Sequence, residues 1–142
     1  MLTPLPTDKT LALLKDPLPF YLSRVPAGFP SPADDYLDRN LDLTELLIQH
    51  PAATFFCRVT GDSMKDAGIF DGDILIVDRA IQAVQGDVVV AAIAGELTCK
   101  FLDIRHRRLL PANKTYKPIP IAENGELEIE GVVIHSIRYH RG

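Results

Sequence analysis

Two residues of the sequence, Ser63 and Lys100, could together perform nucleophilic chemistry. Ser63 follows Gly61 and Asp62, which are turn-forming residue types, so its hydroxyl should emerge at an exposed corner of the fold. Lys100 is the only charged residue in the apolar segment 97–102. Burial can lower the pKa of a lysine by up to about 3–5 from its usual value of about 10.4. A desolvated Lys100 could therefore be a neutral amine and act as general base to Ser63, as in known Ser-Lys pairs.

Each of these residues also has a structural interpretation. Ser63 could be the N-cap of a short helix through Ala67, because serine and aspartate satisfy free N–H groups at helix starts. Lys100 could be an edge-strand lysine that prevents aggregation, or a lysine whose stem reaches along apolar surface to water. Met64 could form the floor of a site or be a core methionine.

Short β-strands would have to position these residues. Apolar or alternating runs bounded by turn residues predict strands over 54–59, 74–78, 87–94, 96–104, 108–110, 127–130 and 132–138. Gly95 and Asn124-Gly125 mark tight turns. The segment Asp42-Leu43-Thr44-Glu45 has the pattern of a helix start, for a short helix through Gln49. The sequence therefore predicts a mostly β, compact, largely antiparallel fold with one short helix.

The first 40 residues differ from the rest of the chain. Seven of the eleven prolines lie there, and proline removes a backbone donor and disfavours helix before it. We therefore expect two parts, an extended N-terminal arm over residues 1–40 and a β-rich domain over residues 41–142. The arm is too short and too interrupted for a helix-turn-helix, so no direct DNA-binding head is expected.

Within the arm, Ala27-Gly28 is a small pair flanked by Pro26 and Pro30. Prolines hold the neighbouring backbone extended, which suits presentation of a peptide bond to a cleft. An ordinary linker turn is the alternative, because such linkers are common.

Five motifs together resemble the LexA and UmuD family of self-cleaving Ser-Lys peptidases. They are Gly61-Asp62-Ser63-Met64, the segment 71–78, the segment 86–90, Lys100-Phe101-Leu102 and Leu110-Pro111-Ala112-Asn113. The resemblance implies a β fold of the LexA C-terminal peptidase type. It implies Ser63 as nucleophile, Lys100 as general base and cleavage between Ala27 and Gly28. Backbone N–H groups of Asp62, Ser63 and Met64 would hold the oxyanion.

The resemblance also implies a role in the bacterial SOS response to DNA damage. In that family a RecA filament on single-stranded DNA stimulates self-cleavage. The layout of arm and core resembles the UmuD branch, whose trimmed product is a homodimer that serves a Y-family, UmuC-like polymerase in translesion synthesis and SOS mutagenesis. Two alternatives stay open at this point: a non-catalytic β interaction module, and a phage-repressor-like peptidase domain.

The composition of the chain limits the kinds of partner, ligand and compartment that we expect for it. The net charge of −4 argues against a stand-alone nucleic-acid binder, and the basic run 105–108 is interpreted as a solvated turn between strands rather than a phosphate site. Cys57 and Cys99 fall inside predicted strands without metal-ligand spacing, which indicates buried thiols in a reducing compartment, with no metal or cofactor expected. The sequence has no signal-peptide pattern and no run of 18 apolar residues. We therefore expect a cytoplasmic protein without a membrane partner.

Overall fold

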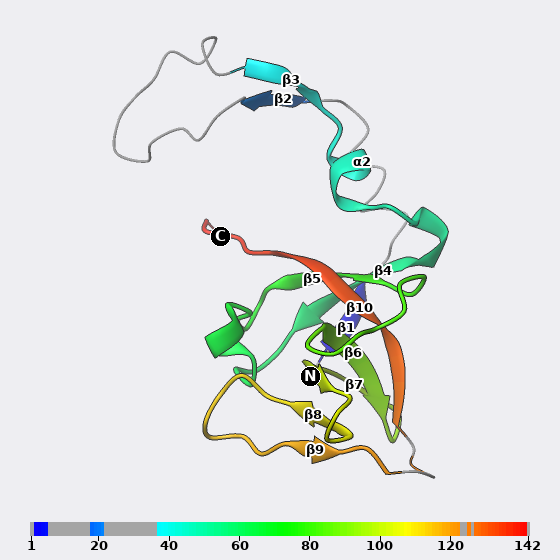
Figure 1. Cartoon of the computed structure of the whole chain (residues 1–142). Helices are drawn as coiled ribbons and strands as arrows, with labels where there is room; N and C mark the ends of the chain where they lie inside the picture. The colour runs from blue at the N-terminus through cyan, green and yellow to red at the C-terminus, as the bar shows by residue number, and fades with distance from the viewer. Residues whose placement is uncertain (1, 6–17, 22–36, 123–124, 126, 142) are drawn as a thin grey trace. The chain divides into compact units, whose positions relative to one another are not determined.

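The computed structural model describes residues 2–5, 18–21, 37–122, 125 and 127–141 (Figure 1). The chain divides into two compact units, one formed by Met1–Thr7 together with His50–Gly142 and the other by Asp8–Gln49. The division into an arm over residues 1–40 and a domain over residues 41–142 stays a prediction.

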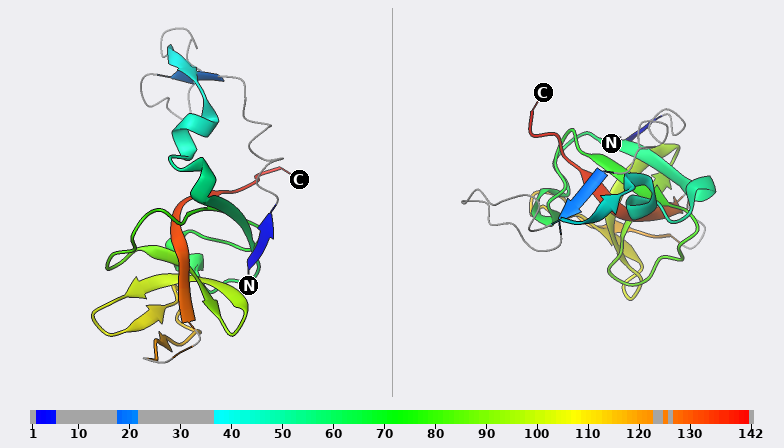
Figure 2. Two further views of the ribbon diagram at one scale, coloured as in Figure 1. Left: turned by 90° about the vertical axis from the view of Figure 1, so that its right-hand side faces the viewer. Right: turned by 90° about the horizontal axis from the view of Figure 1, so that it is seen from above.

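The larger unit is built on one eight-stranded sheet (Figure 1). In spatial order its strands are β1 (Leu2–Leu5), β4 (Thr54–Val59), β5 (Ile74–Asp78), β10 (Leu127–Ile137), β6 (Val88–Ile93), β7 (Glu96–Asp103), β8 (Arg108–Leu110) and β9 (Ile119–Pro120). All neighbours pair antiparallel. The outer strand β1 also contacts β7, so the sheet curls back on itself (Figure 2). The predicted mostly β, antiparallel fold is confirmed.

The smaller unit contains β2 (Leu18–Tyr21) and β3 (Leu37–Leu41), which pair antiparallel, and the helix α2 (Leu43–Leu47). The predicted helix start is confirmed, because Asp42 Oδ1 accepts a hydrogen bond from the backbone N–H of Thr44 at 2.9 Å. The helix ends earlier than predicted, since Ile48 has extended backbone angles. Within the predicted arm the structure therefore has a pair of strands. β2 contains Pro19, which a strand with one partner tolerates.

Strand β10 was predicted as two strands and is one. It lies between β5 and β6, and its register against β6 shifts between Ile129 and Gly131. A Cβ atom on Gly131 would lie 2.7 Å from Val77 Cγ1 and 3.0 Å from the carbonyl oxygen of Asp78. The glycine therefore marks a bulge where β5 and β10 approach closely, not the end of a strand.

The main core cluster lies between the two chain segments that carry Ser63 and Lys100. Its buried members are Leu2, Cys57, Val59, Met64, Ile69, Leu75, Val77, Val90 and Cys99. Cys57 and Cys99 are free and buried, as predicted. Burial raises the pKa of the Cys57 thiol to about 11 and that of the Cys99 thiol to about 12. Met64 and Cys99 are chain neighbours of Ser63 and Lys100, so the core fixes the backbone beside both.

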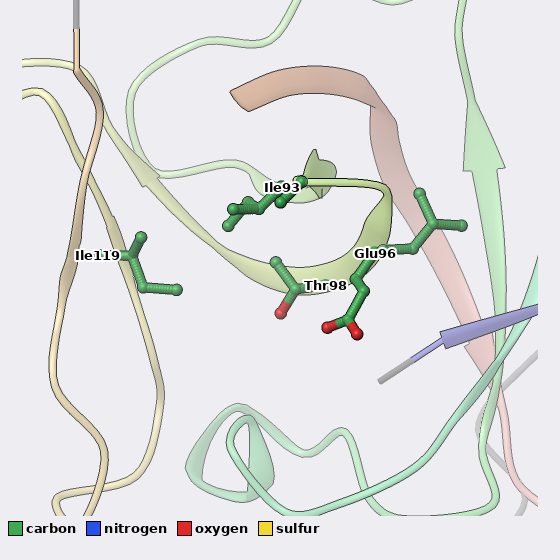
Figure 3. Close-up of a pocket in the computed structure, with 6 residues that line it drawn as sticks. Ile93, Glu96, Thr98 and Ile119 are labelled. Atoms are coloured by element: carbon green, nitrogen blue, oxygen red, sulfur yellow. The ribbon is translucent and has the colours of Figure 1, made fainter. Parts of the chain in front are cut away.

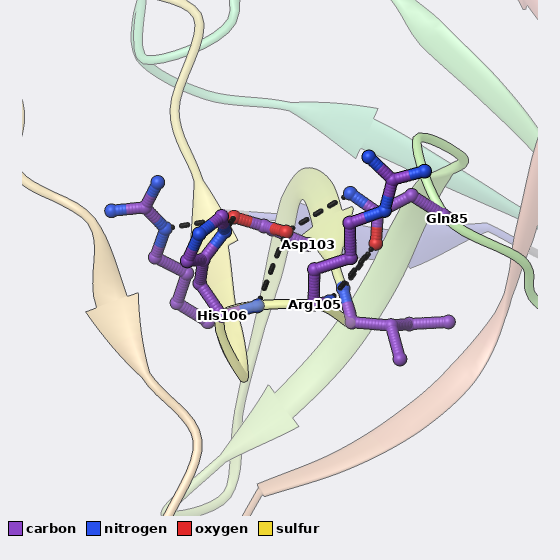
Figure 4. A network of polar contacts seen from close by, with 6 residues as sticks. Gln85, Asp103, Arg105 and His106 are labelled. Carbon is purple, nitrogen blue, oxygen red and sulfur yellow. Dashed lines mark hydrogen bonds and ion pairs between the residues drawn. The ribbon is translucent and has the colours of Figure 1, made fainter.

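The turn that links β7 to β8 is held by a buried carboxylate (Figure 4). Asp103 accepts hydrogen bonds from Arg108 Nε at 2.8 Å and from Gln85 Nε2 at 2.9 Å. The hydrogen bond from Arg108 is the main reason that the pKa of Asp103 lies well below its usual range, and the bond from Gln85 adds to the effect. Arg105, His106 and Arg107 are exposed, so the prediction of a solvated turn is confirmed. The network fixes the β7–β8 register close to Lys100.

Candidate active site

Ser63 lies on the loop that connects β4 to β5. Two backbone hydrogen bonds close the base of this loop, from Val59 N to Asp73 O and from Gly72 N to Val59 O, each 2.8 Å long. Gly61 has a φ of 99°, which favours glycine, and its N–H donates to Asp71 Oδ1 at 2.8 Å. Hydrogen bonds therefore hold this loop as a tight corner between β4 and β5, as the turn residues predicted.

An ion pair anchors the far side of the same loop. Asp73 is 1% exposed, and both its oxygens accept hydrogen bonds from Arg138 at 3.1 Å. Arg138 Nη2 also donates to the carbonyl of Gly68 at 2.6 Å, and its guanidinium lies over the Phe70 ring. The residue that follows β10 thus holds the second half of the loop that carries Ser63.

The segment after Ser63 is the 3₁₀ helix η3 (Lys65–Ala67). Its N-cap residue is Met64, and no side chain caps it. The interpretation of Ser63 as a helix cap is therefore wrong. Met64 is 2% exposed and belongs to the core cluster, where it lies directly behind the loop.

Lys100 projects from β7 and is 7% exposed. Its Nζ lies 2.8 Å from Ser63 Oγ, 2.9 Å from Thr98 Oγ1 and 3.0 Å from the carbonyl oxygen of Cys99. Strand β7 lies between β6 and β8, so Lys100 is not on an outer strand of the sheet. The structure brings the side chains of Ser63 and Lys100 into direct contact.

Burial dominates the electrostatics of Lys100. It lowers the pKa of the ammonium below its ordinary value, and only the Cys99 thiolate would oppose the shift. With its pKa raised to about 12, the Cys99 thiol carries no charge at neutral pH. Among the residues that the structure describes, Lys100 forms no ion pair with a carboxylate. A larger share of Lys100 is therefore neutral near pH 7 than of a surface lysine.

A stability measurement tests this burial. We expect Lys100→Met to raise the free energy of unfolding by about 0.5–2 kcal/mol at neutral pH, because it removes a charge that is costly to bury. The unfolded state binds more protons than the folded state between the lowered pKa and about 10.4, so the stability of the wild type rises with pH across that window. The difference in free energy of unfolding between Lys100→Met and the wild type, measured by denaturant unfolding, should therefore become smaller as the pH rises through that window. A constant advantage at every pH would contradict the lowered pKa.

A second loop, Leu110–Tyr116, holds the backbone on either side of Ser63. The N–H of Ala112 donates to the carbonyl of Ser63 at 2.8 Å, and Asn113 Nδ2 donates to the carbonyl of Asp62 at 3.0 Å. Tyr116 adds a hydrogen bond from its hydroxyl to Asp62 Oδ1 at 2.7 Å. In a trans peptide the N–H points opposite to the carbonyl, so these bonds aim the N–H groups of Ser63 and Met64 away from the second loop.

The sequence predicted no individual role for Asn113 or Tyr116. Asn113 was noted only as part of the motif Leu110-Pro111-Ala112-Asn113, and its hydrogen-bond partner, the carbonyl of Asp62, is distant in the sequence. Thr98 was also missed, although the pattern contained a signal: it precedes Lys100 by two positions in a strand, so both side chains lie on one face.

A cavity of about 690 Å³ opens beside Thr98 (Figure 3). Its lining comes from the end of β6, the turn that follows, the first half of β7 and β9, and consists of Ile93, Ala94, Glu96, Leu97, Thr98 and Ile119. One lining residue, Thr98, also contacts Lys100 Nζ, whereas Ser63 and Lys100 are not themselves part of the lining. Its mainly apolar wall can receive an extended apolar segment.

Three further predictions concern features that the structure covers in part or not at all. Ala27 and Gly28 lie outside the described residues. No group of three or more His, Cys, Asp or Glu side chains that could bind a metal occurs within the described ranges. None of the helices in the described part of the chain is long and apolar enough to cross a membrane.

Comparisons with known proteins agree with this geometry. The family model described as Peptidase S24-like matches residues 19–134. The chain is 49% identical to protein MucA of Escherichia coli over 87% of this chain and 86% of that protein. It is 48% identical to protein SamA of Salmonella typhimurium over 84% and 86% of the two chains. It is 42% identical to the LexA repressor of Xylella fastidiosa over 84% of this chain but 57% of that protein. The chain therefore belongs to the Peptidase S24-like family of peptidases.

Proposed function

We propose that this chain is a serine peptidase that cuts its own N-terminal segment between Ala27 and Gly28. Ser63 is the nucleophile and Lys100 the general base. The observation that carries the proposal is the 2.8 Å contact between Lys100 Nζ and Ser63 Oγ, made by a buried lysine in a member of a peptidase family. A neutral amine at hydrogen-bond distance from a hydroxyl is the arrangement that general-base activation requires.

In the first half of the reaction, neutral Lys100 accepts the proton of Ser63 Oγ as that oxygen attacks the carbonyl carbon of Ala27. The C–O bond forms and the carbonyl electrons move onto the oxygen. Backbone N–H groups of the segment from Asp62 to Met64 stabilise this oxyanion. The orientation of the Ser63 and Met64 peptide groups by the second loop supports their part in this role.

In the second half, the tetrahedral intermediate collapses and the bond between Ala27 and Gly28 breaks. The Lys100 ammonium gives its proton to the departing nitrogen of Gly28, which leaves as a free amine. Lys100, neutral again, then accepts a proton from water as the water attacks the ester on Ser63. Hydrolysis releases the carboxylate of Ala27 and restores the Ser63 hydroxyl.

Asn113 is a positioning residue in this proposal. Because its amide holds the Asp62 carbonyl and thereby the direction of the Ser63 N–H, Asn113→Ala should slow cleavage by about 10²-fold, as loss of an oxyanion donor does. The pH at which the rate is half-maximal should not move, since Lys100 keeps its surroundings. The exposed neighbour Lys114 provides the matched control, Lys114→Ala. A shifted pH midpoint in Asn113→Ala would contradict the assignment.

The biological role that we propose follows from the family resemblance. The similarity to MucA and SamA supports it. In this proposal residues 1–40 are an arm that carries the cleavage site, and residues 41–142 are the peptidase and dimerisation domain. A RecA filament on single-stranded DNA raises the fraction of chains whose arm is docked for cleavage. The product from Gly28 onward is a cytoplasmic homodimer that serves a Y-family, UmuC-like polymerase in SOS mutagenesis.

Mass spectrometry tests the proposed cut. The purified chain is incubated with RecA, nucleotide and single-stranded DNA, with Ser63→Ala as the matched control. We expect two fragments, whose masses correspond to residues 1–27 and 28–142, from the wild type only. An intact wild-type chain, or the same fragments from Ser63→Ala, would overturn the proposal.

A further inference from the structure

Arg138 is the first residue after β10, and it lies opposite the residue that precedes β5. The ladder between these strands ends with Ile137 opposite Ile74, so Arg138 and Asp73 continue its register. Asp73 is 1% exposed, and both its oxygens accept hydrogen bonds from Arg138 at 3.1 Å. Within the described ranges no other cation forms an ion pair with this carboxylate. Because removal of Arg138 would leave a buried charge uncompensated, the guanidinium is held firmly in its place.

The same guanidinium binds the loop that carries Ser63 at two more points. Its Nη2 donates to the carbonyl oxygen of Gly68 at 2.6 Å, and its Cζ lies 4.1 Å from the centroid of the Phe70 ring. The backbone N–H of Phe70 in turn donates to Asp73 Oδ2 at 2.8 Å. One side chain from outside the loop therefore fixes three residues in the half of the loop next to β5.

Backbone hydrogen bonds connect this half of the loop to the nucleophile. The N–H of Gly68 donates to the carbonyl of Lys65 at 3.0 Å, and the N–H of Ile69 donates to the carbonyl of Met64 at 3.2 Å. Met64 directly follows Ser63 and is 2% exposed. A displacement of Gly68 and Ile69 is therefore passed on to the residue beside Ser63.

The contact between Ser63 and Lys100 tolerates little displacement. Their side chains are 2.8 Å apart, and a general base must lie within about 2.6–3.2 Å of the group whose proton it accepts. A misplacement of roughly 1 Å can cost about 10²-fold in rate. The amine of Lys100 also binds Thr98 Oγ1 and the carbonyl of Cys99, both on β7, so it does not follow when the loop moves.

We propose that Arg138 is a positioning residue of the peptidase. Its guanidinium, bound to the buried carboxylate and to the loop, keeps Ser63 Oγ within reach of the Lys100 amine. Arg138 acts through the loop alone and does not touch the reacting atoms. The inference rests on the proposed function, because Ser63 and Lys100 have the roles assigned there.

Arg79 provides a matched control, since it has similar surroundings away from this loop. Its Cζ lies 4.6 Å from the centroid of the Phe55 ring, and its Nη2 lies 3.9 Å from Glu130 Oε2. These partners belong to β4 and β10 and not to the loop that carries Ser63. Arg79→Ala therefore removes an arginine that is stacked on an aromatic ring and paired with a carboxylate, but leaves the loop intact.

The test measures two rates in the wild type, Arg138→Ala, Arg138→Lys and Arg79→Ala. The first is self-cleavage, followed by mass spectrometry. The second is acylation of Ser63 by a small fluorophosphonate, which does not require a docked N-terminal segment. Circular dichroism gives the folded fraction of each variant. Ethylguanidinium, which replaces the atoms missing from Arg138→Ala, is added at about 10 mM, far below the molar range in which guanidinium unfolds proteins.

We expect Arg138→Ala to lose about 10²-fold in both rates at an equal folded fraction, because the hydroxyl of Ser63 moves away from its base. Arg138→Lys keeps a cation for Asp73 but lacks the planar fork that also reaches Gly68, so it should lose about tenfold. Ethylguanidinium should raise both rates of Arg138→Ala about tenfold, with saturation, and should not change those of Arg79→Ala. Arg79→Ala itself should react as the wild type does.

Wild-type rates in Arg138→Ala, or an equal loss in Arg79→Ala, would overturn the inference. So would a loss that ethylguanidinium does not reduce. Slower self-cleavage with an unchanged fluorophosphonate rate would also overturn it, because the defect would then not concern the position of Ser63. If Arg138→Ala does not fold, the two rates of Arg138→Lys decide. A wild-type chain that neither cuts itself nor reacts with the fluorophosphonate would overturn the proposed function instead.

Discussion

Replacement of Lys100 by alanine is expected to leave the Ala27-Gly28 bond intact at every pH, with a loss in cleavage rate of at least about 10³-fold. The amine of Lys100 lies 2.8 Å from Ser63 Oγ, and alanine leaves no base in its place. Fragment formation at pH 7 to 10, followed by mass spectrometry with and without a RecA filament, measures the loss.

Two controls make this result specific. Ser63→Ala should lose as much activity as Lys100→Ala, and the double variant should lose no more, because the two residues act as one unit. Lys117→Ala removes an exposed lysine and should cleave as the wild type does. If Lys100→Ala is cut at the wild-type rate while Ser63→Ala stays intact, Lys100 is not the base.

The wild-type chain should cut itself faster as the pH rises, without any filament. Burial lowers the pKa of Lys100, and below that pKa the neutral fraction grows about tenfold with each pH unit. The cleavage rate should rise in proportion and reach a plateau once the pH exceeds the pKa of Lys100. Single-turnover rates across the range measure the slope and the plateau.

The shape of the pH–rate profile distinguishes Lys100 from other possible general bases. A histidine base would give a plateau above about pH 6.5, and a reaction that needs no base would give a flat profile. Either outcome would contradict the role of Lys100. Circular dichroism at each pH verifies that the chain is still folded where the rate is highest.

Much of the fold could be predicted because its signals are local. Alternating and apolar runs identified the strands from residue 54 onward except β9, although they divided β10 into two, and the capping pattern at Asp42 located the helix start within one residue. The placement of Ser63 on a corner and of Lys100 in a buried strand followed from turn residues and from one charge among apolar neighbours. Such features depend on a few adjacent residues, so the sequence alone reveals them.

Features that depend on distant partners could not be predicted. Strand β1 forms because Leu2 fills a place in a core whose other members lie beyond residue 56. Asn113 holds a carbonyl 51 residues away, and no local pattern encodes that contact. In the sequence, Gly131 suggested the end of a strand. The structure shows that a glycine is needed inside the strand because Val77 lies too close for a Cβ atom, and the sequence does not reveal that proximity.

The central claim, that Lys100 supplies a neutral amine to Ser63, is tested most directly by titration of that amine. NMR of Ser63→Ala chain labelled with ¹⁵N and ¹³C in lysine follows the Lys100 side chain with pH, since this variant stays uncut. We expect a pKa of Lys100 below the ordinary value of about 10.4, equal to the midpoint of the wild-type rate profile within the effect of the missing hydroxyl. A Lys100 that titrates at or above the ordinary value, in a chain whose wild type cuts itself at full rate at neutral pH, would contradict it.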